Sequence, residues 1–209
     1  MNNTMKFFKY IYICLREKID IIKSFLKRKH YNSIASINNG KISTNALLTI
    51  HDWRAREKEC NFLFVFDNDN FIKEMKKLFH QKNWYLKALR KVNRYVNCSI
   101  KYQTDEDNWS RIDYWETSCE TLIRKKADCE GQAILKYRIL KEIGFEDEDM
   151  FIAVMRDHAT LIVRVDDNYY ILDNSDITYA VQKTNNVIDP NELLFGFNLS
   201  NEYSFKNAT

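Results

Sequence analysis

Proline and glycine are scarce in this 209-residue chain, which has one proline and four glycines. Collagen-like and linker-rich proteins depend on these residues and are therefore excluded. A charge excess is also lacking: 32 basic and 29 acidic residues leave a net charge of +3, so no global positive field favours nucleic acid. The longest early apolar run, residues 10–15, is far shorter than the ~20 residues of a membrane-spanning helix. What remains, 45% hydrophobic and 14% aromatic residues, is sufficient for the core of one folded domain.

The five cysteines form an odd set without CxxC spacing. Disulfide frameworks are typically built from even, regularly spaced sets, so we expect none here. We interpret Cys14, Cys60, Cys98 and Cys119 as small core residues. Cys129 has a different context, described below.

The N-terminal segment carries most of the positive charge, because residues 1–30 contain eight basic and two acidic residues. Residues 5–29 are interpreted either as a basic amphipathic helix packed on the domain or as a membrane-surface or export element. No small-residue cleavage site follows the apolar run, so a clean signal peptide is not expected. The Asn- and Ser-rich residues 30–50 are expected to form a linker or long loop. We therefore divide the chain into an N-terminal segment, 1–60, and a folded domain, 61–209.

Helical and strand patterns follow each other along the domain. Apolar spacing predicts helices over residues 71–96 with a break near 80–83, and their Lys/Arg face is interpreted as solvated rather than as a nucleic-acid surface. A further helix is predicted between Asp128, a favourable N-cap, and Gly144, a typical stop signal. Residues 151–156, 159–165 and 169–173 are typical of strands. Helices followed by consecutive strands predict an α+β fold with an antiparallel sheet.

Cys129 occupies the first position of the predicted helix at 129–143. The helix dipole and the unpaired N–H groups at that end favour a thiolate over a thiol. A nucleophilic cysteine also needs a base, normally an imidazole. Of the four histidines, three lie in the N-terminal segment or at a helix break, and His158 begins a predicted strand. His158 is therefore the candidate base.

Strand register brings an aspartate near this histidine. If residues 166–167 form a two-residue turn, Thr160 lies opposite Asp173, and His158 is diagonal to Asp173 on the same face. This arrangement would give a Cys129, His158 and Asp173 triad. Each member also has a structural interpretation, because a strand histidine is often structural and Asp173 is followed by turn-forming residues.

Two carboxylates, Asp128 and Glu130, flank the candidate nucleophile and would oppose thiolate formation. Either they point away, with Asp128 capping the helix, or a cation neutralises them. Their hard oxygen atoms suit Ca²⁺, although carbonyls and waters would have to complete its shell of 6–8 ligands. Residues 101–120, acidic and rich in Trp and Tyr, form either a packed connection or one wall of a cleft.

The stretch DYWETSCETLIRKKADCEGQAILKYRILKEIGF, residues 113–145, resembles the bacterial transglutaminase-like cysteine proteinases, the LapG-like family. The shared pattern continues with a histidine opening a hydrophobic strand, His158-Ala159, and with Leu172-Asp173-Asn174 at the end of the next strand. The residues that match the family pattern in the first stretch are Asp113, Tyr114, Trp115, Thr117, Glu120, Asp128, Cys129, Glu130, Ala133, Ile134, Lys136, Tyr137, Leu140 and Gly144.

The resemblance implies a papain-like, transglutaminase-like core, in which the helix carrying the nucleophilic cysteine packs on an antiparallel sheet, with extra N-terminal helices. It implies that Cys129 is the nucleophile, His158 the base and Asp173 its orienting partner, with Asp128 and Glu130 as ligands of Ca²⁺. Known members are calcium-dependent periplasmic proteases that cut surface adhesins and so release biofilm. This chain departs from the pattern at Gly131-Gln132, where the family has an acidic-aromatic pair.

The leading hypothesis is therefore a cysteine protease acting on a protein or peptide substrate. Two alternatives stay open at this point. The same triad would also serve an acyltransferase with an amine acceptor, and the same fold would serve a non-catalytic binding module. Periplasmic location is implied by the resemblance, whereas the N-terminus without a clean signal leaves a cytoplasmic location open.

Overall fold

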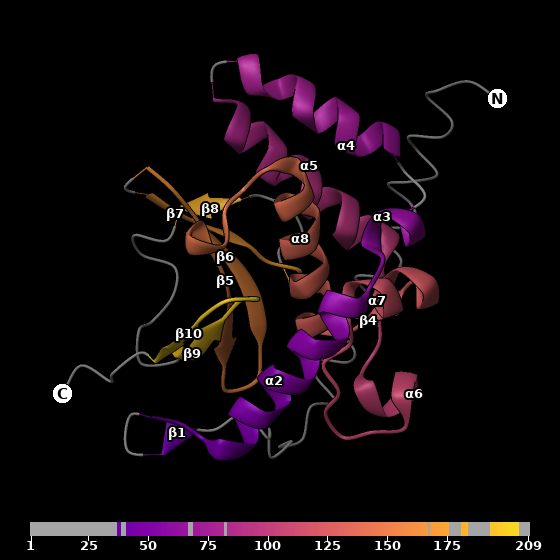
Figure 1. Ribbon diagram of the computed structural model, residues 1–209, viewed down its shortest axis with the longest axis vertical. Coiled ribbons are helices and arrows are strands. Elements are labelled where there is room, and N and C mark those ends of the chain that lie inside the picture. Colours follow the sequence, from indigo (N-terminus) through magenta and orange to yellow (C-terminus); the bar gives the residue numbers. More distant parts are fainter. Residues whose placement is uncertain are drawn as a thin grey trace.

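The computed structural model describes residues 37–38, 41–66, 69–81, 83–166, 168–175, 181–183 and 193–204 (Figure 1). The predictions made for residues 5–29 lie outside this part of the chain. The helical elements are α2 (Thr44–Glu59), α3 (Phe62–Val65), α4 (Asp69–Lys76), η1 (Lys77–His80), α5 (Trp84–Ser99), α6 (Asp105–Trp109), α7 (Ser118–Arg124), α8 (Cys129–Ile143) and η2 (Asp147–Asp149). The strands are β1 (Ile37–Asn38), β2 (Lys41–Ile42), β3 (Lys101–Tyr102), β4 (Lys126–Ala127), β5 (Met150–Met155), β6 (Ala159–Val165), β7 (Asn168–Leu172), β8 (Gln182–Lys183), β9 (Leu193–Phe197) and β10 (Glu202–Ser204).

The main sheet has the strand order β10-β9-β5-β6-β7-β8, and each neighbouring pair is antiparallel. The expected α+β class with an antiparallel sheet is confirmed. The β6–β7 hairpin has the predicted register, with Val165 opposite Asn168 and Leu161 opposite Leu172. Asp166 in the turn has φ 52°, a left-handed conformation that aspartate tolerates better than most residues.

Helix α8 lies against one face of this sheet, with α5 and α7 packed around it (Figure 1). The large core joins apolar side chains of α8 to Ala159, Leu161 and Val163 of β6. The opposite sheet face carries a smaller cluster that includes Ile162 and Ile171. This division confirms the alternation predicted for residues 159–165, since successive strand residues point to opposite faces.

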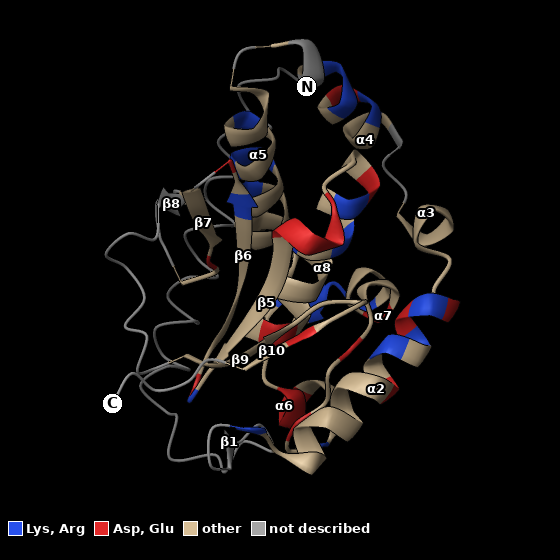
Figure 2. Cartoon of the chain, turned by 60° about the vertical axis from the view of Figure 1, so that its left-hand side comes forward, with Lys and Arg blue, Asp and Glu red and all other residues tan. Residues whose placement is uncertain are grey.

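The predicted helices over residues 71–96 form α4, η1 and α5, with the break at the expected place. Basic residues recur along α4 and α5, whose ribbons carry several blue segments in Figure 2. The basic side chains that the structure describes on these helices are exposed, as a solvated face requires. They are Lys73, Lys76, Lys77, Lys87, Arg90, Lys91 and Arg94. Among the described helices, none is long and apolar enough to cross a lipid bilayer.

Helix α2 corrects the expected linker over residues 30–50, because the chain is helical from Thr44. Its N-cap is Ser43, whose side chain accepts a hydrogen bond from the Ala46 N–H at 3.2 Å. Ala46, Ile50 and Trp53 are fully buried, and the Trp53 ring meets Phe197 of β9 at 5.2 Å. Residues 44–60, which the division at residue 60 assigned to the N-terminal segment, therefore pack into the domain core. Three apolar residues at helical spacing are enough to bury one face of α2, although the surrounding sequence is polar.

A disulfide between Cys60 and Cys119 corrects the expectation that these residues are reduced core cysteines. The bond joins the C-cap of α2 to the first turn of α7, across 59 positions of sequence. The same contact is reinforced by Glu57, which accepts hydrogen bonds from the N–H and the hydroxyl of Ser118 at 2.7 and 2.5 Å. Sequence spacing did not reveal the pair, since the packing of α2 against α7 brings the two residues together.

Candidate active site

The N-terminus of α8 presents Cys129 at its first position, as predicted. Asp128 is the N-cap, and its Oδ1 accepts a hydrogen bond from the Gly131 N–H at 3.2 Å. At the other end Gly144 has φ 116°, and its N–H donates to the carbonyls of Leu140 and Lys141. The predicted start signal, Asp128, and the predicted stop signal, Gly144, are both confirmed. Because the cap holds the first turn in place, the position of the Cys129 backbone is well defined.

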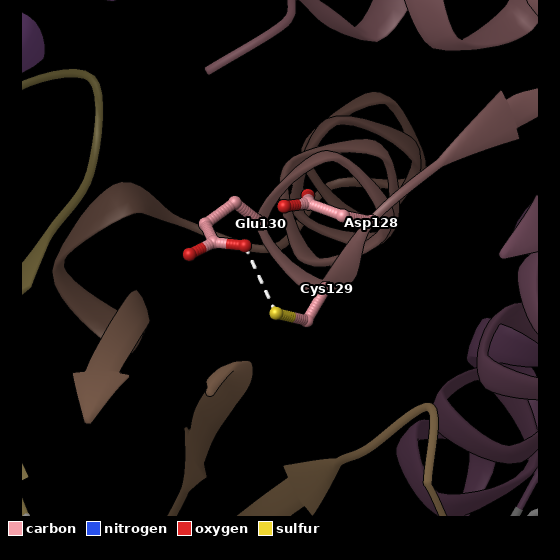
Figure 3. A group of neighbouring side chains, drawn as sticks. All are labelled: Asp128, Cys129 and Glu130. Atoms are coloured by element: carbon pink, nitrogen blue, oxygen red, sulfur yellow. Dashed lines mark hydrogen bonds between the residues drawn. The ribbon is translucent and has the colours of Figure 1, made fainter. Parts of the chain in front are cut away.

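Cys129 is a free cysteine and only 3% exposed. Its Sγ donates a hydrogen bond to Oε2 of Glu130 at 2.9 Å, and a carboxylate oxygen of Asp128 lies within 4.8 Å of both residues' ligand atoms (Figure 3). The capping role expected for Asp128 is therefore present. Glu130 instead faces the sulfur, and a carboxylate that accepts the S–H proton favours the thiol over the thiolate.

His158 and Asp173 form the predicted pair, with Nε2 of the imidazole 2.8 Å from Oδ1 of the carboxylate. Asp173 also accepts hydrogen bonds from the N–H and the hydroxyl of Ser175, at 3.0 and 2.9 Å. Burial by itself would raise the pKa of Asp173, but the hydrogen bonds and positive charge around it hold that pKa well below the ordinary value. An ionised Asp173 that engages Nε2 leaves Nδ1 of His158 for a second partner.

The end of β7, where Asp173 follows Leu172, is held by two helices. Lys136 of α8 donates from Nζ to the Leu172 carbonyl at 3.0 Å, and Asn97 of α5 donates from Nδ2 to the Asp173 carbonyl at 2.8 Å. Lys136 is 1% exposed. Sequence reasoning assigned neither residue a site role. A lysine within the apolar run of the 129–143 helix was the available signal for Lys136, because a lysine is almost never fully buried without a partner.

Three carboxylates converge at the same end of α8. Oxygen atoms of Asp105, Glu116 and Asp128 all lie within 4.8 Å of one another. Asp105 begins α6, whose acidic residues are red in Figure 2, and Glu116 lies just before α7. Sequence reasoning grouped Asp105 and Glu116 only with the acidic 101–120 segment. Their proximity to Asp128 depends on how three separate segments fold together.

Burial dominates the electrostatics of this cluster. It raises the pKa of Asp105 to about 8 and that of Glu116 to about 9, and charge repulsion among the carboxylates acts in the same direction. Burial and the charge of neighbouring Glu130 likewise raise the pKa of Asp128. Among the described residues, neither oxygen of Glu116 has a hydrogen-bond partner. Converging hard oxygen atoms of this kind fit a calcium ion, which prefers carboxylate and carbonyl ligands.

Comparison with known proteins places the chain in a family. The family model described as bacterial transglutaminase-like cysteine proteinase matches residues 65–186, more than half of the sequence. This range contains Cys129, His158 and Asp173. No curated protein sequence matches the chain.

Solved structures with a similar fold include LapG of Legionella pneumophila in several forms. The calcium-bound form is 21% identical, with a TM-score of 0.54, over 75% of this chain and 87% of LapG. The EGTA-treated form is 21% identical, with a TM-score of 0.55, over 77% and 88%. These likenesses confirm the expected transglutaminase-like fold. On the match to the family model, this chain belongs to the bacterial transglutaminase-like cysteine proteinases.

Proposed function

We propose that the protein is a cysteine peptidase in which Cys129 is the nucleophile, His158 the general base and acid, and Asp173 the residue that orients the imidazole. The proposal is carried by the 2.8 Å contact between His158 Nε2 and Asp173 Oδ1. A free cysteine at the capped N-terminus of α8 supports it. Family membership supports a peptidase and a protein or peptide as the substrate.

The proposed reaction begins with transfer of the Cys129 thiol proton to Nδ1 of His158, the nitrogen that Asp173 leaves available. The sulfur then attacks the substrate carbonyl carbon, and the Cys129 backbone N–H with a neighbouring donor binds the oxyanion. As the C–N bond breaks, the imidazolium returns its proton to the leaving amine. Water, deprotonated by His158, hydrolyses the thioester and regenerates the free thiol.

Asp173 contributes by fixing the tautomer and orientation of the imidazole and by stabilising the imidazolium. Its carboxylate is itself fixed by Ser175, while Asn97 and Lys136 hold the backbone on either side. The geometry of the His158–Asp173 pair is thus built into the junction between β7, α5 and α8 before a substrate binds.

Calcium dependence is part of the proposal. Asp128 and Glu130 would hold the ion, and a bound divalent cation would supply positive charge that offsets the carboxylates beside the sulfur. Release of Glu130 from Cys129 would remove the hydrogen bond that now favours the thiol. The proposal is supported by the carboxylates that converge at the α8 N-terminus, and solved LapG structures include a calcium-bound and an EGTA-treated form.

A periplasmic location is proposed as well. The Cys60–Cys119 disulfide supports this location, because structural disulfides persist mainly in oxidising compartments.

The test of the peptidase is Cys129→Ala. We expect cleavage of a protein substrate to disappear while the melting temperature and circular dichroism spectrum stay close to those of the native protein. New N-termini, identified by mass spectrometry, report proteolysis. Incorporation of a labelled amine without new N-termini would instead identify an acyltransferase, and full cleavage by the alanine variant would refute the assignment of Cys129.

A further inference from the structure

Three apolar side chains are exposed on two neighbouring short helices. Phe64 and Leu63 of α3 are 84% and 52% exposed, and Ile123 of α7 is 71% exposed. We infer that this group, which we call the α3–α7 patch, attaches the protein to the surface of an anionic lipid bilayer. The inference does not depend on the peptidase proposal, and it rests on no residue of the N-terminal segment 5–29.

The outward direction of Phe64 is fixed by its neighbours. Phe62 and Phe66 are each 1% exposed, and their rings stack with centres 5.2 Å apart. These two residues are four positions apart and therefore lie on the same side of the helical turn. At about 100° per residue, Phe64 between them points to the opposite side. Its exposure thus follows from the packing of α3, which holds the ring ready to contact a partner.

The Cys60–Cys119 disulfide brings Ile123 to the same edge of the molecule. Helix α3 begins two residues after Cys60 and packs against α7. Ile123 lies one turn after Cys119, so it is on the same side of α7 as the bonded cysteine. Figure 1 shows both helices at one edge of the fold. The three apolar side chains therefore form one patch, although they come from distant parts of the sequence.

Exposed basic residues flank this patch. Lys58 lies in the last turn of α2, just before α3, and Lys125 and Lys126 lie just beyond the end of α7. Lys126 is in register with the exposed Lys101 of β3, and like charges placed side by side weaken a sheet. The ion pairs among the described residues involve none of these four lysines. An anionic surface would therefore find their charge available.

Further positive charge lies on α4 and η1, which follow α3 in the sequence. Lys73, Lys76 and Lys77 are exposed and line a hollow of about 620 Å³ together with Asn70 and Glu74. In Figure 2, α3 lies at the edge of the molecule between α4 and the end of α2, and blue segments mark basic residues on both helices. The apolar tip is thus bordered by positive charge on two sides.

The composition of the patch fits an anionic bilayer better than a protein partner. A stable protein–protein interface buries roughly 1,200–2,000 Å², far more than three side chains supply. At a bilayer, by contrast, a few aromatic and aliphatic side chains enter the boundary between headgroups and acyl chains. Flanking lysines then contact the phosphates of anionic lipids, and each one strengthens the attachment.

The experiment measures sedimentation of the full chain with lipid vesicles. Vesicles of equal parts phosphatidylglycerol and phosphatidylcholine are compared with vesicles of phosphatidylcholine alone, at low and at high NaCl concentration. We expect binding to the anionic vesicles that weakens as salt is added, and binding to the neutral vesicles that is at least about tenfold weaker. Phe64→Ser should weaken binding to the anionic vesicles about tenfold, because it removes the most exposed apolar side chain of the patch.

A matched pair of leucine variants tests the apolar contribution. Leu63→Ser removes an exposed leucine of the patch, whereas Leu48→Ser removes one that is 63% exposed in the N-terminal half of α2, at the opposite end of that helix from α3. Leu63→Ser should weaken vesicle binding severalfold, and Leu48→Ser should bind within twofold of the native protein.

A matched pair of lysine variants tests the charge. Lys126→Glu reverses a charge beside the patch, and Lys41→Glu reverses one on β2, an exposed position far from α3. Lys126→Glu should weaken binding to the anionic vesicles severalfold without lowering the melting temperature, because its carboxylate would lie opposite Lys101. Lys41→Glu should bind within twofold of the native protein.

Native-like vesicle binding by both Phe64→Ser and Lys126→Glu would overturn the inference, because residues outside the patch would then hold the protein to the lipid. Failure of the native protein to bind anionic vesicles would overturn it as well. A native dimer that Phe64→Ser converts to a monomer in light scattering would instead assign the patch to contact between copies of the chain. If Phe64→Ser does not fold, Leu63→Ser and Lys126→Glu decide the result on the same criterion.

Discussion

At the scale of single residues, the His158–Asp173 pair is the feature that sequence reasoning anticipated most closely. Val165 pairs with Asn168 as expected, and that register places the imidazole within 2.8 Å of the carboxylate. A shift of one residue would have moved one partner to the opposite face of the sheet. The alternation of the strand and a two-residue turn were therefore enough to predict this contact.

Asp173→Asn tests the orienting role. We expect kcat to fall by at least about 100-fold, because an amide stabilises the imidazolium poorly and permits the wrong tautomer. Labelling of Cys129 by a small electrophile across a pH series provides a second readout. If the variant keeps native kcat and an unchanged labelling profile, Asp173 has only a structural role.

The same variant tests a pH dependence of stability. The pKa of Asp173 is lowered in the folded protein from the ordinary value of 3.8. The ionised carboxylate therefore contributes its full stabilisation of the folded state at pH values well above 3.8, and this stabilisation is lost as the pH falls through the folded-state pKa. The melting temperature of Asp173→Asn should lie below that of the native protein at pH 7, and the gap should narrow below about pH 4. A gap that widens in acid would contradict this assignment.

At the scale of elements, α8 connects the proposed nucleophile to the histidine–aspartate pair. Its first residue is Cys129, and two turns later Lys136 donates to the last carbonyl of β7. The boundaries of α8 were predictable because an N-cap aspartate and a C-terminal glycine act locally. The start of α2 could not be predicted in this way, because its three buried apolar residues lie in a polar sequence and are stabilised by distant partners such as Phe197.

Lys136→Met tests the hydrogen bond that joins α8 to the end of β7. The variant keeps the length of the side chain but leaves the buried Leu172 carbonyl without this donor, at a cost of about 1–3 kcal/mol. Because Asp173 follows that carbonyl, kcat should fall roughly tenfold through misorientation of His158, with little change in KM. Lys141→Met is the control: this lysine of α8 pairs with Asp147 rather than with β7, so its loss should affect stability but not kcat. Equal effects of both variants on kcat would contradict the proposed role of the Lys136–Leu172 hydrogen bond.

At the scale of the whole molecule, a disulfide and a buried glutamate join α2 to α7. Cys60–Cys119 closes a long loop, which restricts the unfolded chain, and the Glu57–Ser118 hydrogen bonds lie beside it. The Glu116 segment runs directly into α7, so this connection also supports the carboxylate cluster.

Replacement of both Cys60 and Cys119 by serine tests this connection. Loss of a disulfide that closes a loop of this size should cost roughly 2–4 kcal/mol of unfolding free energy. The measurement is urea unfolding of the native and the double-variant protein, together with the native protein in reducing agent. The reduced native protein and the variant should unfold at similar, lower urea concentrations. An unfolding midpoint of the variant equal to that of the oxidised native protein would contradict a stabilising role.

By itself, the sequence determined the features that depend on neighbouring residues: the capped helix that begins at Cys129, the strands of the β5–β7 meander and the register that pairs His158 with Asp173. These follow from periodicity, caps and a short turn, all of which act over a few positions. Only the tertiary structure decided which distant residues meet, namely Asp105 and Glu116 with Asp128, Cys60 with Cys119, and Lys136 with the end of β7. Their contacts come from the packing of separate segments, and no local pattern in the sequence encodes which side chains that packing brings together.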